Sequence, residues 1–181
     1  MDEIIDIVDS EWKPTGEIIG KNIAHRGWVL HRVAHVHIYD NKWNIYFQKR
    51  SQSRKHFPWM LHFAIWWHVW AGEDVLDAAI REWEEEVWLS INRDKLDLIG
   101  KFHQNVIHKE YGLHDNEIAY DYIYSCDWKV DEFVFEDWEV ESIEFMHIDE
   151  LLNIPFDQYA KLGIVPYMYY PIILEWIKKF L

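Results

Sequence analysis

The chain is poor in cysteine, glycine and positive charge. It has one cysteine, Cys126, and seven glycines among 181 residues, and its 18 lysines and arginines face 32 aspartates and glutamates. A single cysteine excludes a disulfide within the chain, which fits the reducing cytoplasm. The formal net charge of −14 leaves no global positive field, so we do not expect a nucleic acid as partner.

The chain also lacks the marks of a targeting or membrane segment. Its first residues, "MDEIIDIVDSE", are acidic and do not show the basic start and apolar run of a signal peptide. The longest uncharged stretch near the end, 162–174, contains two prolines and is too short to cross a bilayer. We therefore expect no membrane partner, and we expect this stretch to form a buried helix or helix pair.

Composition and patterning predict one α+β domain over residues 1–181. Half of the residues are hydrophobic and 28% are charged, as in globular proteins, and the length allows a sizeable core. Alternating or β-branched stretches predict strands at 3–8, 29–40, 44–50, 61–65, 96–107, 117–127 and 141–148, with a hairpin at the polar "DNKW". Helices are predicted at 75–87, 148–154 and 167–181. This mixed order predicts helices covering a mixed sheet.

The helix predicted over 75–87 is unusually acidic. Its apolar residues recur at three- and four-residue steps and form a buried stripe: Leu76, Ala79, Ile80, Trp83 and Val87. Glu82, Glu85 and Glu86 then share one flank of about 100° of arc, and Arg81 lies four residues before Glu85, close enough to pair with it. This flank is either a solvated acidic face or a set of oxygen ligands for Mg²⁺. As a solvated face it would carry roughly 0.2–0.5 kcal/mol of repulsion for each close pair of carboxylates.

The residues around the helix favour the metal site. "AGEDVLDAAIREWEEEV" resembles the Nudix hydrolase signature G-x5-E-x7-R-E-U-x-E-E-x-G-U, where U is apolar, with correct spacing and every charged position present. "LHRVAHVHIYD", "IYFQKRSQSRKHFPW" and "LHFAI" resemble the branch that contains isopentenyl-diphosphate isomerase and its hydrolase relatives. The resemblance covers roughly residues 1–150 and implies the Nudix fold, a mixed β-sheet sandwiched between α-helices.

The resemblance also implies roles for individual residues. Mg²⁺ or Mn²⁺ would be bound by carboxylates that match the family's ligands: Glu82, Glu85 and Glu86, with Glu73 close to the site. Such a metal neutralises phosphate oxygens and activates a water for attack on phosphorus. Arg81, which orients Glu85, joins the catalytic set. The general base stays open between Glu85 and Glu139, because relatives often supply a base from the region of "FEDWEVES".

A basic stretch, "QKRSQSRKH", supplies cations for a diphosphate. The resemblance implies substrate contacts by Arg50, Arg54 and Lys55; the alternative is an ordinary basic loop that balances the acidic surface. The sequence therefore predicts a divalent-metal-dependent hydrolase that cleaves a pyrophosphate bond in a nucleoside-diphosphate-linked or other small diphosphate. The leaving group and the oligomeric state, a homodimer included, stay open.

An isopentenyl-diphosphate isomerase is the first alternative. Isomerases carry a cysteine where this chain has Trp66, and they tend to lose part of the R-E-U-x-E-E set that is complete here, so hydrolysis is favoured. His31, His35 and His37 share one face of a predicted strand. With His68 they could form a second metal site, as in the isomerases, but no carboxylate is fixed among them by the sequence, so a structural hydrogen-bonding role is favoured.

Tryptophan is over-represented, and its positions are unusual. Eight of the twelve tryptophans stand where the family or a polar turn would have glycine: Trp12, Trp43, Trp59, Trp66, Trp67, Trp88, Trp128 and Trp138. A bulky residue at positive φ costs on the order of 1–3 kcal/mol. Either the molecule has glycine at these positions, or its loops have moved and the chain is a catalytically impaired binding module. The first explanation is favoured, and it predicts positive φ at Trp43, Trp88 and Trp128.

Overall fold

A mixed seven-stranded sheet forms the centre of the computed structural model, which describes residues 2–180 apart from 64, 88–89, 130–131 and 134–139. The strands are β3 (His31–Tyr39), β4 (Asn44–Arg50), β5 (Leu61–His62), β6 (Ile65–His68), β7 (Leu96–His108), β8 (Leu113–Ser125) and β9 (Val140–His147). They follow the order β5-β4-β3-β8-β7, with β6 on β3 and β9 on β4. The β3–β8 pair is parallel and the other pairs are antiparallel.

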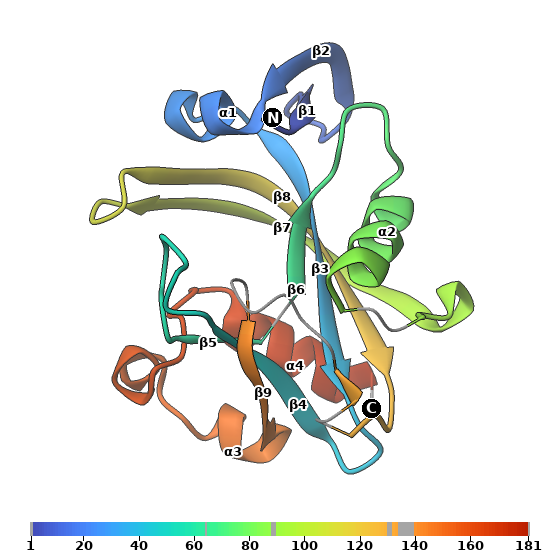
Figure 1. The fold of residues 1–181 in the computed structure, drawn as a ribbon, viewed down its shortest axis with the longest axis vertical. Helices are drawn as coiled ribbons and strands as arrows, with labels where there is room; N and C mark the ends of the chain where they lie inside the picture. The colour runs from blue at the N-terminus through green and yellow to red at the C-terminus, as the bar shows by residue number, and fades with distance from the viewer. Residues whose placement is uncertain (1, 64, 88–89, 130–131, 134–139, 181) are drawn as a thin grey trace.

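Helices cover both faces of this sheet (Figure 1). They are α2 (Val75–Val87), α3 (Ile148–Leu152) and α4 (Tyr170–Phe180), with 3₁₀ turns at Arg93–Lys95, Phe156–Gln158 and Ala160–Leu162. Val36 of β3 belongs to one core cluster with Ala79 and Trp83 of α2. Phe47 of β4 belongs to a second cluster with Ile173 of α4. The predicted α+β class, a mixed sheet between helices, is therefore confirmed.

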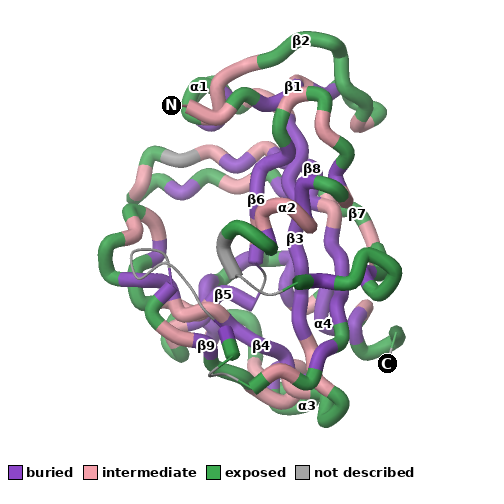
Figure 2. The backbone as a smooth tube through the Cα atoms, turned by 45° about the vertical axis from the view of Figure 1, so that its right-hand side comes forward, coloured by how far each residue is buried: buried purple, intermediate pink, exposed green. Residues whose placement is uncertain are grey.

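The N-terminal part adds a two-stranded sheet and a helix that the sequence did not predict in full. This sheet pairs β1 (Ile4–Val8) with β2 (Pro14–Gly20), and α1 (Lys21–Gly27) follows. Figure 2 shows β2 largely exposed, whereas β3, β6 and β8 are buried. Because β2 buries little apolar surface, it lacks the alternating pattern by which β1 was predicted.

Two predicted elements differ from the structure. The single strand predicted over 61–65 is wrong, because β5 ends at His62 and β6 begins at Ile65. The stretch 162–174 is helical only at its start and from Tyr170 onward. Proline restricts the residue before it and cannot donate within a helix. Pro166 accordingly lies in an irregular segment between helices, and Pro171 lies in the first turn of α4. Among the described residues, every helix falls short of the length and apolarity that crossing a membrane needs.

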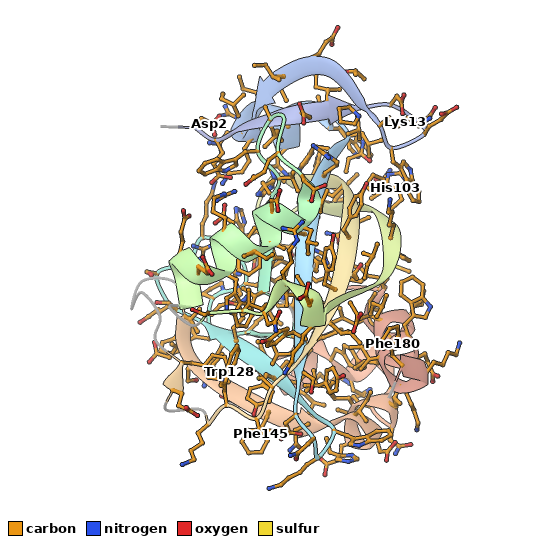
Figure 3. The ribbon with its side chains drawn as sticks, turned by 90° about the vertical axis from the view of Figure 1, so that its right-hand side faces the viewer. Asp2, Lys13, His103, Trp128, Phe145 and Phe180 are labelled. Atoms are coloured by element: carbon orange, nitrogen blue, oxygen red, sulfur yellow. The ribbon has the colours of Figure 1, made fainter. Side chains whose placement is uncertain are left out.

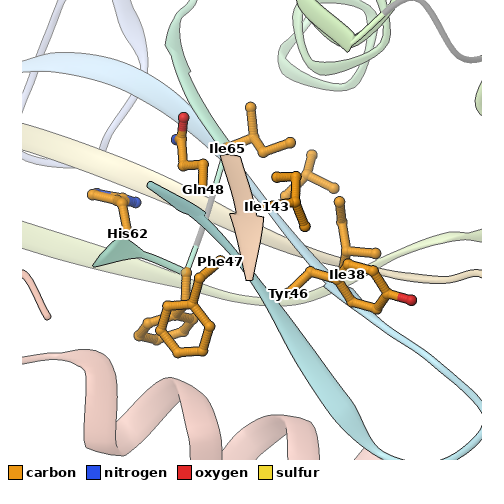
Figure 4. A pocket seen from close by; sticks show the side chains of 9 residues that line it. Ile38, Tyr46, Phe47, Gln48, His62, Ile65 and Ile143 are labelled. Atoms are coloured by element: carbon orange, nitrogen blue, oxygen red, sulfur yellow. The ribbon is translucent and has the colours of Figure 1, made fainter. Parts of the chain in front are cut away.

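A small cavity lies where β3 and β4 diverge (Figure 4). These two strands pair at Tyr39 and Ile45. Where they separate, side chains that include Ile65 and Ile143 line the space between β3 and β4. Its volume of about 10 Å³ is about that of one water-sized probe. This cavity is therefore too small to hold a diphosphate.

Tryptophans occupy backbone positions that favour glycine. Among the described residues, five besides glycine have positive φ, and four are tryptophans: Trp12 (67°), Trp28 (55°), Trp43 (67°) and Trp59 (66°). The predicted positive φ is confirmed at Trp43. It is wrong at Trp128, whose φ is not positive, and Trp88 lies outside the described residues. The indole of Trp128 instead stacks on Trp83 and Tyr124, with ring centroids 5.7 and 5.5 Å away; it is labelled in Figure 3.

We expect Trp43→Gly to be more stable than Trp43→Ala by about 1 kcal/mol. Both variants remove the indole, but only glycine removes the left-handed strain of about 1–2 kcal/mol, which exceeds its own entropic cost of about 0.5–1 kcal/mol. Urea unfolding of the two variants measures the difference. Equal stabilities, or a more stable alanine variant, would contradict strain at this position.

Candidate active site

Arg81 gathers the acidic residues of α2 and of the turn before it. Its Nε and Nη2 donate to the two carboxylate oxygens of Glu73 at 2.8 and 2.9 Å. Its Nη1 donates to Glu82 at 2.7 Å and to Glu85 at 3.4 Å. The guanidinium also lies over the Trp70 ring, 3.7 Å from its centroid. One cation thus holds three carboxylates along one edge, and the four-residue spacing predicted only its contact with Glu85.

The turn that carries Glu73 is fixed to the N-terminal strand β1. Asp6 accepts hydrogen bonds from Arg32 at 2.7 Å and from the backbone N–H of Gly72 at 2.9 Å. Arg32 also donates to the backbone oxygen of Glu73 at 3.2 Å. Because these groups come from β1, β3 and the turn before α2, tertiary contacts set the position of Glu73.

Burial differs between these carboxylates. The side chain of Glu82 is 14% exposed and that of Glu85 is 58% exposed. Burial raises the pKa of Glu82, whereas the hydrogen bonds from Arg81 lower the pKa of Glu73. Glu86 lies on α2 one turn after Glu82, but its side chain is outside the described part of the structure. Glu139 also lies outside the described residues.

The predicted substrate cations lie together in a pocket of their own. Arg50, Arg54 and Lys55 line a pocket of about 360 Å³ with Ser53 and His56. None of the described carboxylates of α2 is among these lining residues. The structure therefore brings the three cations to one place, but it does not join that place to the acidic flank through this pocket.

A second cluster of metal-ligand side chains lies under α1. Ligand atoms of His25, His31, His68 and Glu117 all lie within 4.8 Å of one another, and all four residues are buried. His31 and Glu117 occupy paired positions of the parallel strands β3 and β8. The rings of His25 and His31 are 5.0 Å apart, and those of His25 and His68 are 5.1 Å apart.

The hydrogen bonds of this histidine centre favour a cation in its middle. The Nδ1 atoms of His25 and His31 face the backbone oxygens of His114 and Val29 at 3.1 and 2.8 Å. Carbonyls only accept, so each Nδ1 carries a proton and each Nε2 faces the centre. There His25 Nε2 also lies 2.9 Å from His68 Nε2, within hydrogen-bond distance.

Two buried atoms at the centre have no hydrogen-bond partner among the described residues, His31 Nε2 and Oε1 of Glu117, and they lie 3.4 Å apart. A nitrogen lone pair facing a carboxylate is repulsive unless a positive charge lies between them. Burial and the neighbouring His31 and His25 lower the pKa of His68 well below its ordinary range, which keeps this ring neutral. Neutral imidazoles and a carboxylate are a donor set for a divalent metal, so the residues fit such an ion.

The basic loop connects to the histidine centre through packed side chains. The ring of Phe57 lies 5.1 Å from that of His108, and His108 contacts Asp115 at 3.0 Å. Asp115 in turn lies 3.5 Å from Nδ1 of His25. Figure 1 shows the β4–β5 loop rising towards the β7–β8 hairpin, which carries His108 and Asp115. The loop is therefore linked to this centre through Phe57, His108 and Asp115.

The remaining histidines of β3 form a separate, fully enclosed triad. Asp121 Oδ1 lies 3.1 Å from His35 Nδ1 and 2.8 Å from His37 Nε2, and His37 Nδ1 faces the backbone oxygen of Phe63 at 3.1 Å. Although burial opposes it, the charge of His35 and the hydrogen bonds from His35 and His37 lower the pKa of Asp121 to about 2. These residues form a buried ion-pair network behind the histidine centre.

The sequence identified His31, His35, His37 and His68 but missed His25, both carboxylates and the division of these histidines between two clusters. Glu117 and Asp121 sit on the same face of β8 because they are four residues apart, and the parallel register sets them opposite His31 and His35. The alternation in "EIAYDYIY" is the available signal for their shared face. The pairing of β8 with β3, across some 80 residues of chain, is set by tertiary structure alone.

Comparisons with known proteins agree with this architecture. Residues 29–166 match the model of the NUDIX domain. A Nudix hydrolase of Nostoc sp., uncharacterized in its function, is 29% identical over 155 residues, which cover 82% of this chain and 88% of that protein. The isopentenyl-diphosphate Delta-isomerase of Pectobacterium atrosepticum is 29% identical over 146 residues, 80% of this chain and 76% of that protein. A crystal structure of a Deinococcus radiodurans protein superposes with a TM-score of 0.67 at 19% identity and covers 96% of this chain and 98% of that one.

Proposed function

The chain belongs to the Nudix family, and from this premise we propose that it is a divalent-metal-dependent hydrolase of a pyrophosphate bond in a small diphosphate. The observation that carries this proposal is the Arg81 cluster. One guanidinium holds Glu73, Glu82 and Glu85 along the edge of α2. Together with Glu86, these residues match the charged positions of the family's signature. Mg²⁺ or Mn²⁺ is the proposed cofactor, since both prefer oxygen ligands.

The proposed roles follow from the environment of each residue. Glu82, Glu85 and Glu86 hold the metal, and Arg81 orients Glu85 by the hydrogen bond at 3.4 Å. A metal bound there supplies charge neutralisation and an acidified water. Glu85 is exposed enough to reach a solvent proton, so it serves as one candidate base, and Glu139 is the other. Arg50, Arg54 and Lys55 bind the diphosphate in their pocket.

Isopentenyl-diphosphate isomerisation is the second candidate function. The histidine centre favours it, because a buried metal-ligand set lies next to the diphosphate-binding loop, and an isomerase is among the similar proteins. Trp66, at the position of the isomerase cysteine, opposes it. The ring of Trp66 lies 5.6 Å from that of His68, so it also covers one side of the centre.

A substrate panel tests the two functions against each other. The purified chain is incubated with nucleoside-diphosphate sugars, nucleotides and isoprenoid diphosphates, with and without added Mg²⁺ or Mn²⁺. The products of pyrophosphate cleavage are measured: two phosphomonoesters from a nucleoside-diphosphate-linked substrate, or inorganic phosphate from a terminal diphosphate. Metal-dependent cleavage of at least one diphosphate is the expected result. Cleavage that ignores the metal, or conversion of isopentenyl diphosphate without phosphate release, would contradict the hydrolase; the latter outcome establishes the isomerase.

We expect Lys55→Gln to raise the KM for the diphosphate about 10-fold and to change kcat less. Lys55 lines the basic pocket and is exposed, and a charge-assisted hydrogen bond contributes about 1.5–3 kcal/mol. Lys95, an exposed lysine of the Arg93–Lys95 turn, provides the matched control Lys95→Gln. Equal KM values for the two variants would remove Lys55 from the binding site.

His31→Ala tests whether the histidine centre holds a metal. We expect the wild-type chain, dialysed against trace Mn²⁺ or Zn²⁺, to retain about one equivalent at this centre, and the variant to lose it, because His31 Nε2 is one of the unpaired ligand atoms. Elemental analysis of both proteins measures the difference. His103, an exposed histidine of β7, provides the control His103→Ala. Equal metal contents in wild type and His31→Ala would show that the cluster is a hydrogen-bonded core.

A further inference from the structure

Tryptophan occupies the conformation that glycine favours at four places in the chain, and these places have three different constructions. After Asp9 and after Asp40 the chain makes the same turn, in which the backbone N–H of Trp12 or Trp43, three residues on, donates to the Asp carbonyl at 3.0 Å. In both turns the Asp side chain accepts two further backbone N–H groups. The tryptophan then continues in the left-handed region at φ 67°.

The other two positions are a helix end and a loop end. Trp28 terminates α1 at φ 55° and ψ 39° and donates its backbone N–H to the oxygen of Ala24, which is the arrangement that usually carries glycine after a helix. Trp59, at φ 66°, donates to the backbone oxygen of Arg50 at 3.1 Å and closes the basic loop. Glycine occupies this conformation at no steric cost, whereas a residue with a Cβ is strained there.

These indoles are only partly buried. Trp28, Trp43 and Trp59 are 40–46% exposed, whereas Trp83 is fully buried in the core. Trp67 shows a different mismatch: its side chain is buried, and its indole N–H has no acceptor among the described residues. Buried tryptophans normally pair this group. Four tryptophans thus occupy a backbone conformation that favours glycine, and a fifth buries an unpaired indole N–H. Glycine at these five positions removes both conflicts.

We propose that Trp12, Trp28, Trp43 and Trp59 are glycine in the protein as its own cell makes it. A single codon with two readings places one residue type at unrelated turns at once, which independent substitutions do not. UGA is such a codon, because it is read as tryptophan in some genetic codes and as glycine in others. Seven glycines beside twelve tryptophans is the composition that this misreading produces.

Glycine in place of tryptophan goes beyond the hydrolase function and would also change the surroundings of the histidine centre. Trp66 and Trp67 precede His68 in β6, and the ring of Trp66 lies beside that of His68. If the same codon specifies Trp66, the glycine form removes the indole that covers one side of the histidine centre.

Gene sequence and peptide mass together test the proposal. The four codons are read from the gene, and peptides that span the four positions are measured by mass spectrometry of the protein purified from its source cells. We expect UGA at all four positions and glycine in every peptide. A UGG codon at any of them, or a peptide that contains tryptophan there, overturns the proposal.

A recombinant comparison tests the physical premise without using activity. One variant carries glycine at positions 12, 28, 43 and 59, and its matched control carries alanine at the same four. Both lack the indoles, so they differ in backbone strain. We expect the glycine variant to melt several degrees higher; an equal or lower melting temperature overturns the premise, whatever the enzymatic assays show.

Discussion

Glu85→Gln is expected to lower kcat for metal-dependent cleavage of the diphosphate by about 10²–10⁴-fold. The substitution keeps the shape of the side chain and its acceptor for Arg81, but it removes the charge that binds the metal and the basicity that accepts a proton. Since Glu85 is 58% exposed, loss of its charge leaves stability nearly unchanged. Steady-state kinetics at several Mg²⁺ concentrations separates weaker metal binding from a slower chemical step.

Glu84→Gln is the matched control. Glu84 is exposed on the same helix, and none of the described hydrogen bonds of Arg81 goes to it. We expect its kcat within about twofold of wild type, the effect of an ordinary surface change. If the two variants have the same activity, the flank is a solvated acidic face. Loss of activity in both would point to the total charge of α2, not to one carboxylate.

Asp121→Asn is expected to lower the free energy of unfolding by about 3–5 kcal/mol at pH 7, the usual cost of removing one partner from a buried ion pair. Asp121 is fully buried and is contacted by both His35 and His37. Urea unfolding measures the loss. Asp97, an exposed aspartate of β7, provides the control Asp97→Asn, for which a change within about 0.5 kcal/mol is expected. Equal losses for both would contradict a charged triad.

The same residue gives a defined pH dependence. The pKa of Asp121 is lowered from 3.8 to about 2. The ionised carboxylate therefore contributes fully to the free energy of unfolding above pH 3.8, and this contribution is lost as pH falls through about 2. The shift in pKa corresponds to about 2 kcal/mol of stability. We therefore expect the gap in stability between wild type and Asp121→Asn to narrow by about 2 kcal/mol between pH 5 and pH 2. A constant gap would mean that Asp121 is not ionised in the folded protein.

The local sequence was sufficient where a periodic pattern and its caps lie close together in the chain. The apolar stripe of the acidic helix predicted α2 at its observed bounds, Val75–Val87, and four-residue spacing predicted the contact between Arg81 and Glu85. Both depend on the helical repeat, a local property. The turn at Asp40 was predicted for the same reason, since the conformation that Trp43 adopts is set within four residues.

Tertiary structure alone decided which carboxylate meets which histidine. His31 and Glu117 are 86 positions apart in the chain, and their proximity depends on the register of the parallel β3–β8 pair. A shift by one residue would turn every side chain of β8 to the other face of the sheet. The sequence by itself determined the acidic flank and the basic loop; the packing of β8 against β3 and of α1 above them assembled the histidine centre, because strand register is a property of the whole core.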